Sequence, residues 1–175
     1  MRIEKTKTIS LRLITADDAE FIVSLRQSPK KNQFLSPVSI NVDQQAEWIH
    51  HYKRREAQKL EYYFIICTGN TPVGVVRIYD IQDINFVWGS WIIADCAPKY
   101  AAIESALSIY EFAFNELGFA TSTFDVRKQN TRVLSFHQRF GAIKTHEDDL
   151  NEYFYLTRAI YLKTKERYQK FFLPR

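Results

Sequence analysis

His137 is the residue in this sequence best suited to proton transfer. It shares the i, i+3, i+4, i+7 spacing of one helical face with Val133, Phe136 and Phe140, so it lies on the apolar side of a predicted helix. An imidazole there can pass a proton near neutral pH, provided that burial does not lower its pKa too far. The same position also suits a core histidine whose nitrogens are satisfied, and the sequence leaves both roles open.

A second chemical feature is the segment DCAPKYAA, residues 95–102, which leads into a long amphipathic helix. The first turn of a helix presents unpaired N–H groups, and the helix dipole favours negative charge there. Ala101 and Ala102 leave that backbone uncovered, and Lys99 adds a positive charge. The segment therefore suits a phosphate group. The alternative is a plain helix start with a solvated lysine.

Three carboxylates near predicted strand ends are candidates for taking a proton from a nucleophile: Glu61, Asp80 and Asp83. Nothing in the sequence directs any of them at a site, so we assign no general base. The sequence contains no HExxH, paired CxxC, Walker or GxSxG motif. It therefore gives no support to metal, nucleotide-hydrolase or serine-hydrolase chemistry, and we predict no metal ligands.

The elements that position these groups follow from hydrophobic periodicity and turn residues. Predicted strands span residues 9–14, 61–68, 73–81, 86–93, 121–127, 143–147 and 152–162. Predicted helices run from Thr15 to before Pro29, from Asn41 onward, from Pro98 to Gly118, and from Asn130 to Phe140. This order predicts an α+β fold, a mixed twisted sheet of about seven strands flanked by about four helices. Residues 1–175 would form a single domain, with 162–175 as a basic tail that suits a helix.

The amino-acid composition limits the classes of protein to which this chain can belong. The 175 residues are 46% hydrophobic and 15% aromatic, enough for one domain with a substantial core. The net charge of +4 is spread along the chain, so we expect no nucleic-acid partner. The longest apolar runs are too short to cross a membrane, and the N-terminal segment lacks the apolar core of a signal peptide. We expect a cytoplasmic protein without a membrane partner.

Two local patterns, together with the order of elements, resemble the GNAT N-acetyltransferases. The first is a hairpin strand, a loop and a long helix that ends in AF-x-x-LGF, here Ala113 to Phe119. The second is a strand followed by N-x-x-x-x-x-x-[YH]-x-x-x-G, here FDVRKQNTRVLSFHQRFGA. The resemblance spans roughly Ile9 to Leu162. The LRQSP segment around Arg26 resembles the W-R-N-D-P segment of the branches that acetylate amino-sugar nucleotides and ribosomal-protein N-termini.

The resemblance implies acetyl-CoA as the acyl donor. Its pyrophosphate would lie against the helix start, held by Lys99, Tyr100, Ala101, Ala102 and Ile103. Asn130 would lie near the pantetheine arm, and the backbone N–H groups of Ile92 and Ile93 would polarise the thioester carbonyl. The chain departs from the family's Q/R-x-x-G-x-G/A loop at Ala97 and Tyr100. The ring of Tyr100 must therefore point away from the phosphates if the donor is to bind.

The resemblance also implies a catalytic role for His137. It stands four residues before Gly141, where the family commonly has a tyrosine that protonates the departing thiolate. The first two helices and the loop KKNQFLSPVS would form the acceptor side, with Arg26 for a substrate phosphate and Trp88 in the cleft. Strand alternation places Trp88 and Trp91 on opposite faces, so only one of them would line that cleft.

The expected function is direct acetyl transfer from acetyl-CoA to a primary amine. The preferred acceptor is a small molecule, the amino group of a nucleotide-linked amino sugar. A protein N-terminus is the alternative acceptor, and a non-catalytic GNAT-like binding module is the alternative outside the enzyme class. If the aromatic strand at 152–162 is an exposed edge, it would allow a homodimer.

Overall fold

The structure is a computed structural model that describes residues 2–27 and 41–172. The strands are β1 (Arg2–Ile3), β2 (Ser10–Leu13), β3 (Tyr62–Thr68), β4 (Thr71–Gln82), β5 (Asn85–Ile93), β6 (Thr121–Arg127), β7 (Ile143–Glu147) and β8 (Asn151–Thr157). The α-helices in these ranges are α1 (Ala19–Gln27), α3 (Val42–Ala57), α4 (Ala101–Glu111), α5 (Thr131–Arg139) and α6 (Arg158–Arg167).

The eight strands form one sheet in the order β1-β2-β3-β4-β5-β6-β8-β7. Each pair of neighbours is antiparallel except β5 and β6, which run parallel. The predicted α+β fold with one mixed sheet is therefore confirmed. The short strand β1 and the helix α6 add one strand and one helix to the expected set.

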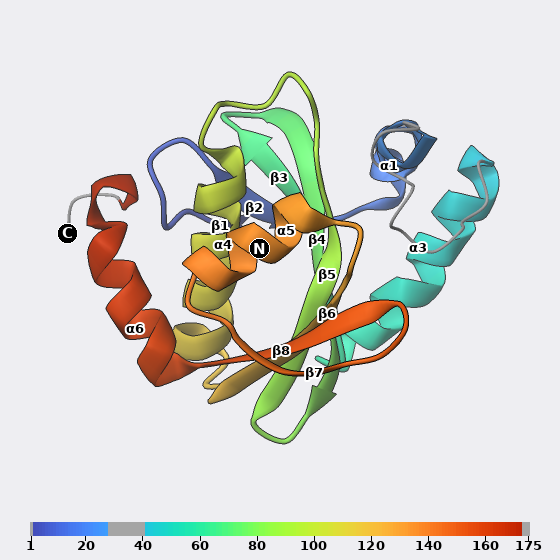
Figure 1. The fold of residues 1–175 in the computed structure, drawn as a ribbon. Coiled ribbons are helices and arrows are strands. Elements are labelled where there is room, and N and C mark those ends of the chain that lie inside the picture. The colour runs from blue at the N-terminus through green and yellow to red at the C-terminus, as the bar shows by residue number, and fades with distance from the viewer. Residues whose placement is uncertain (1, 28–40, 173–175) are drawn as a thin grey trace.

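Helices cover both faces of the sheet (Figure 1). Helices α1 and α3 lie on one face, over a core that includes Ile14, Ile22, Ile49, Tyr52 and Ile65. Helices α4, α5 and α6 lie on the other face, over a larger core that includes Leu107, Tyr110, Phe114, Phe140 and Tyr161. The apolar stripes predicted for the helices are the surfaces that these two cores bury.

Three predicted helix starts are confirmed by their caps. The Asp18 carboxylate accepts the Thr15 N–H at 2.8 Å, and a short 3₁₀ turn, Ala16–Asp18, leads into α1. The side chains of Asn41 and Asn130 accept N–H groups from the first turns of α3 and α5. Pro29 and the loop KKNQFLSPVS lie outside the described residues, so their predicted roles at the acceptor side stay predictions.

The end of the long central helix differs from the prediction. Helix α4 ends at Glu111 and continues as a π-helical turn, Phe112–Glu116, in which the Leu117 N–H donates to the Phe112 carbonyl at 3.0 Å. Gly118 follows with φ of +80°, as expected of a residue that ends a helix. The wider turn keeps Phe112, Ala113 and Phe114 in the core.

The C-terminal part of the sheet also differs from the prediction. Strand β8 ends at Thr157, whose hydroxyl accepts the Ile160 N–H and starts α6. The expected strand to residue 162 is wrong because Tyr161 and Thr164, one helical turn apart, are both buried against the rest of the protein. Strand β8 lies between β6 and β7, so it is not the exposed edge on which the homodimer depended.

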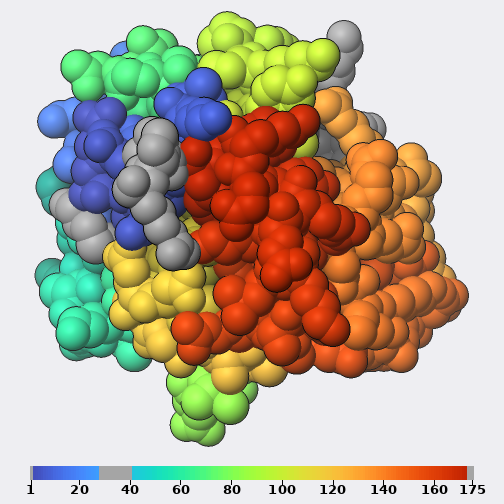
Figure 2. All heavy atoms as spheres, turned by 90° about the vertical axis from the view of Figure 1, so that its left-hand side faces the viewer, coloured from blue at the N-terminus to red at the C-terminus, as the bar shows by residue number. Residues whose placement is uncertain are grey.

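The tail after β8 is packed rather than extended. Helix α6 is followed by a 3₁₀ turn, Gln169–Phe171, and Phe172 forms a bridge with Thr6 near the N-terminus. Figure 2 shows this segment, in red, covering the middle of one side of the molecule. No helix in the described parts of the chain has the length and apolar character needed to cross a membrane.

Candidate active site

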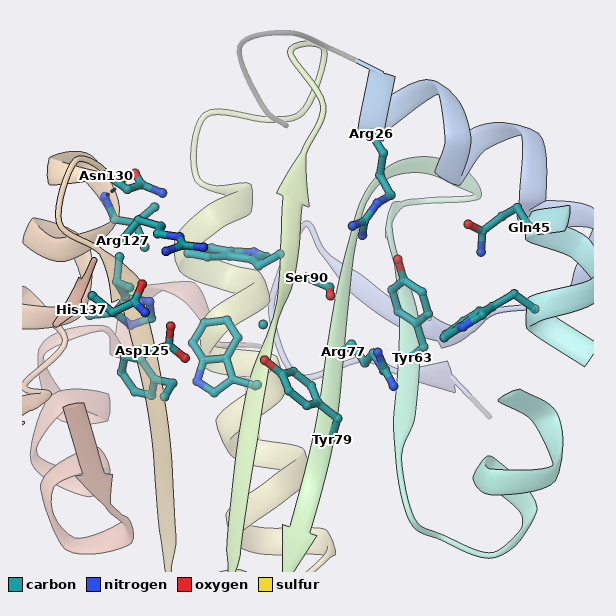
Figure 3. A pocket seen from close by; sticks show the side chains of 18 of the residues that line it. Arg26, Gln45, Tyr63, Arg77, Tyr79, Ser90, Asp125, Arg127, Asn130 and His137 are labelled. Carbon is teal, nitrogen blue, oxygen red and sulfur yellow. Dashed lines mark hydrogen bonds between the residues drawn. The ribbon is translucent and has the colours of Figure 1, made fainter. Parts of the chain in front are cut away.

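The candidate site opens where β5 and β6 separate. The two strands pair only at Asn85–Thr121 and Phe86–Ser122, although both continue for several residues beyond. A pocket of about 630 Å³ lies there, lined by residues of α1, α3, α5 and strands β3 to β6 (Figure 3). Its volume is in the range of small-molecule sites.

A β-bulge in β5 shapes one wall of the pocket. Val75 pairs with Ile92 but Arg77 pairs with Gly89, so β5 carries one extra residue. Ser90, in this bulge, has φ of +47° and itself lines the pocket. The extra residue resets the alternation of side chains. Trp88 and Trp91 therefore both line the pocket, with ring centroids 5.3 Å apart, and the prediction that only one would do so is wrong.

His137 lies at the apolar end of this pocket. Its side chain is 5% exposed and surrounded by the rings of Phe124, Trp88 and Trp91, with the Phe124 centroid 4.3 Å away. Burial lowers the pKa of His137 to about 3, so the imidazole is neutral at physiological pH. Its Nδ1 is buried and has no hydrogen-bond partner in the described residues. These surroundings argue against the imidazolium acid expected from the sequence.

Three arginines line the pocket. Arg26 and Arg77 lie on the side of α1 and α3, Arg127 lies on β6 beside Asn130 (Figure 3), and among the described residues Asp125 is the sole lining carboxylate. Arg77 is paired with the buried Glu61, which Arg55 also contacts, so two guanidinium groups share one carboxylate. The Tyr63 hydroxyl lies next to Arg26 (Figure 3). Burial raises the pKa of Tyr63, and the positive charge of Arg26 opposes that shift.

The start of α4 fits the pyrophosphate expected there. Tyr100, the N-cap residue, packs its ring against Phe171 at a centroid distance of 5.0 Å, and the Lys99 amino group lies over that ring. The ring is thus held by the C-terminal segment rather than free to cover the first turn of α4. Glu104 would repel a phosphate, but its carboxylate is buried and accepts the Thr8 and Ile9 N–H groups. The Ala101 N–H donates to the Pro98 carbonyl, but small first-turn residues, the helix dipole and Lys99 still make this helix start suited to an anion.

The backbone of β5 allows only part of the expected contact with a thioester. The Ala94 N–H donates to the Val73 carbonyl on β4, so the register makes Val75 and Ile92 the next hydrogen-bonded pair. The Ile92 N–H consequently faces β4 and is not available to a ligand between β5 and β6. Ile93 pairs with Gly74 in the alternate position, so its N–H points away from β4.

The structure brings together four of the sequence-predicted residues and separates the others from them. Arg26, Trp88, Asn130 and His137 all line the pocket. Ile92, Ile93 and residues 99–103 lie outside its lining, toward the start of α4. The predicted acceptor groups thus meet in the pocket where β5 and β6 separate, and the predicted donor groups lie nearer the start of α4.

Asp125, Arg127 and Tyr79 line the pocket but were not identified from the sequence. The sequence pattern could have identified Asp125 and Arg127. Residues along Thr121–Arg127 are alternately buried and exposed, so these two side chains lie on the exposed face. The three carboxylates that the sequence did suggest do not line the pocket. Glu61 is buried against arginines, and Asp80 and Asp83 lie in the β4–β5 hairpin region at positive φ.

Comparison with known proteins identifies the family. The model of the acetyltransferase (GNAT) domain matches residues 8–143. The structure titled apo FdhC, a nucleotide-linked sugar GNAT, is 43% identical, covers 99% of each chain and superposes with a TM-score of 0.90. A search of curated proteins finds no match.

More distant structures share the fold. The ribosomal-protein-S5-alanine acetyltransferase of Vibrio fischeri is 12% identical, with a TM-score of 0.77 over 90% of this chain and 96% of its own. The spermidine N-acetyltransferase of Vibrio cholerae, solved with CoA and spermine, is 17% identical, with a TM-score of 0.73 over 89% and 98%. The family match supports an enzyme and not the non-catalytic binding module that the sequence left as an alternative. The chain belongs to the GNAT family and is an N-acetyltransferase that uses acetyl-CoA as its acyl donor.

Proposed function

We propose that this enzyme acetylates the amino group of a nucleotide-linked amino sugar. The observation that carries the proposal is the charge of the acceptor pocket, where the described lining residues include three arginines, Arg26, Arg77 and Arg127, and one carboxylate, Asp125. Guanidinium groups bind phosphate oxygens in bidentate geometry, so an excess of arginine suits the diphosphate of a nucleotide sugar. A polyamine, which is polycationic, would be repelled by the same pocket.

The relative with 43% identity supports the proposal independently, because its title describes a nucleotide-linked sugar GNAT. A protein N-terminus remains the second candidate acceptor. It rests on a fold likeness at 12% identity, which carries no information about substrate. The arginine-rich pocket favours neither a neutral peptide nor a free amine. We therefore rank a protein N-terminus below the nucleotide sugar as an acceptor.

The pocket residues would hold the acceptor amine against the donor. Bound acetyl-CoA supplies a thioester whose carbonyl carbon is attacked by the amine nitrogen. The chain contributes Asn130 beside the gap between β5 and β6, and an aromatic wall of Trp88, Trp91 and Phe124 that excludes water. Holding both reactants in one pocket makes the attack effectively intramolecular.

Acceptor specificity tests the proposal. CoA thiol release would be followed with four amines: a nucleoside-diphosphate amino sugar, the same sugar without the nucleotide, a peptide with a free N-terminus, and spermidine. We expect kcat/KM for the nucleotide-linked sugar to exceed that for the free sugar by about 100-fold or more, since the phosphates supply binding energy. Preference for the peptide or for spermidine would overturn the proposal.

Arg26→Gln supplies a test of the phosphate contact. We expect it to raise KM for the nucleotide-linked sugar by about tenfold, equivalent to roughly 1.4 kcal/mol, and to leave the free sugar unaffected. Arg54→Gln, on the exposed face of α3 and outside the pocket, is the matched control. An equal effect of Arg26→Gln on both sugars would mean that Arg26 does not contact the phosphates.

A further inference from the structure

The reaction needs a group that takes a proton from the acceptor nitrogen. A primary amine has two N–H bonds when it attacks, and the nitrogen becomes strongly acidic as the new C–N bond forms. A carboxylate within reach is basic enough to receive that proton. The carboxylates suggested by the sequence, Glu61, Asp80 and Asp83, lie outside the pocket. His137, the other basic group there, is enclosed by aromatic rings at the apolar end.

Asp125 has the placement that the chemistry requires. It lies on β6 directly after Phe124, which contacts His137, and its side chain is exposed in the pocket. In Figure 3 the Asp125 carboxylate and the Tyr79 hydroxyl point toward each other across β5. Within the described parts of the chain the structure gives the Asp125 carboxylate no hydrogen bond or ion pair, so both oxygens are available to a ligand.

Tyrosine and arginine side chains lie around Asp125. Tyr79 projects from β4 over Gly89, where a Cβ would meet the Tyr79 hydroxyl oxygen at 3.0 Å. Arg77 lies 5.2 Å over the Tyr79 ring. Tyr153 pairs with Asp125 across β6 and β8, and Arg127 follows two residues later on the same face. The charge of Asp125 raises the pKa values of Tyr79 and Tyr153, after the larger effect of burial for Tyr79 and of the Asp148 hydrogen bond for Tyr153.

We propose that Asp125 is the general base that receives the proton of the acceptor amine during acyl transfer. The proposal rests on the proposed function only in requiring an amine acceptor in this pocket. The acceptor ammonium first loses one proton to solvent. Its nitrogen lone pair then forms the bond to the acyl carbon, the carbon–sulfur bond breaks, and Asp125 takes the second nitrogen proton. That proton passes through solvent to the departing sulfur, so amide, CoA thiol and one released proton balance the reaction.

Asp125→Asn and Asp125→Ala test the assignment, with Asp149→Asn as a control that removes an exposed carboxylate outside the pocket. We expect both Asp125 variants to lower kcat by about 10²- to 10⁴-fold, the usual contribution of a general base, with KM for the acceptor changed by less than about threefold. Asp149→Asn should keep wild-type kinetics. The melting temperature and the affinity for desulfo-CoA should stay at wild-type values in all three, because Asp125 makes no structural contact.

Chemical rescue separates a base from a binding or positioning group. Formate, a small carboxylate, can enter the space left in Asp125→Ala, and we expect it to restore kcat in proportion to its concentration while leaving Asp125→Asn unaffected. A rise in KM with unchanged kcat, or no rescue by formate, would overturn the assignment. Each variant is compared with wild type on whichever amine the wild type uses. Failure of nucleotide-linked sugars as acceptors is therefore distinguished from failure of Asp125 as the base.

Discussion

At the scale of single residues, His137 shows how the same side chain can suit two chemistries until its surroundings are known. Its helical spacing places it on an apolar face, and the structure encloses it among Trp88, Trp91 and Phe124. Burial disfavours the imidazolium, so the pKa of His137 is lowered and the group is neutral, with a buried Nδ1 that has no hydrogen-bond partner among the described residues. A thiolate leaving group needs little acid assistance, because thiol pKa values are only about 8.5.

The buried neutral imidazole makes a prediction about stability and pH. The unfolded chain binds a proton at His137 below about pH 6.5, whereas the folded protein does so only near pH 3, so stability falls as pH decreases between these values. When the pH is lowered from 7 to 5, we expect the protonation of His137 in the unfolded chain to lower the unfolding free energy of the wild type by about 2 kcal/mol. Urea unfolding of wild type and His137→Phe at both pH values measures the difference.

The control for this prediction is His50→Gln, which removes an exposed histidine on α3. In this variant the unfolding free energy should fall between pH 7 and pH 5 by as much as in the wild type. In His137→Phe the fall should be smaller by about 2 kcal/mol. Equal pH dependence in all three proteins would mean that His137 titrates normally in the folded state.

At the scale of elements, the start of α4 has alanines in its first turn and no glycine. Ala101 and Ala102 sit in or beside the first helical turn, where φ is negative and alanine is not strained. Tyr100 would be the obstacle, but its ring is packed against Phe171 of the C-terminal segment. The position of the Tyr100 ring at the predicted donor site therefore depends on a distant part of the chain, through that one aromatic contact.

Ala102→Asp separates anion binding from helix stability. An aspartate in the first turn of a helix interacts favourably with its dipole, so the unfolding free energy should change by less than about 0.5 kcal/mol. The same charge would repel a pyrophosphate, and we expect the affinity for desulfo-CoA to fall at least about tenfold by calorimetric titration. Ala102→Asn is the uncharged control of similar shape, and equal affinities of the two variants would place the pyrophosphate elsewhere.

At the scale of the whole molecule, α6 joins the C-terminal segment to the central helix. The Tyr161 hydroxyl donates to the Glu111 carboxylate at 2.6 Å, and Lys165 pairs with the same carboxylate at 2.8 Å. Glu111 is 8% exposed, and the Asn115 amide donates to its other carboxylate oxygen at 3.1 Å, so Lys165 is the cationic partner among three side chains that stabilise its charge. The contact also holds η3, the turn Gln169–Phe171, near the start of α4.

Lys165→Met is expected to destabilise the protein by about 2–3 kcal/mol, because it leaves a largely buried carboxylate without its cationic partner, with only the neutral donors Tyr161 and Asn115. Glu111→Gln combined with Lys165→Met should recover part of the loss, since the unpaired charge is then removed. Thermal unfolding of the single and double variants measures the coupling. A double variant less stable than Lys165→Met would show that Lys165 does not compensate the charge of Glu111.

Much of this architecture was predictable from local sequence. Capping residues such as Thr15, Asn41 and Asn130 determine where helices begin, and apolar periodicity determines which faces are buried. These signals depend on neighbours a few residues apart, so the α+β order and the family patterns followed from them. The strand boundary at Thr157 was missed, because its aromatic segment suits a strand and a helix equally well by composition.

The site itself required the tertiary structure. One extra residue at Ser90 moved Trp91 to the face of Trp88, and alternation along the strand cannot reveal such a bulge. Asp125 lines the pocket because β5 and β6 pair at only two positions and separate before Asp125. The sequence by itself determined the order of elements, the fold and the small-residue helix start at which we predict anion binding, since these depend on local spacing. Tertiary structure decided the burial of His137 and which carboxylate lines the pocket, since contacts between distant strands set both.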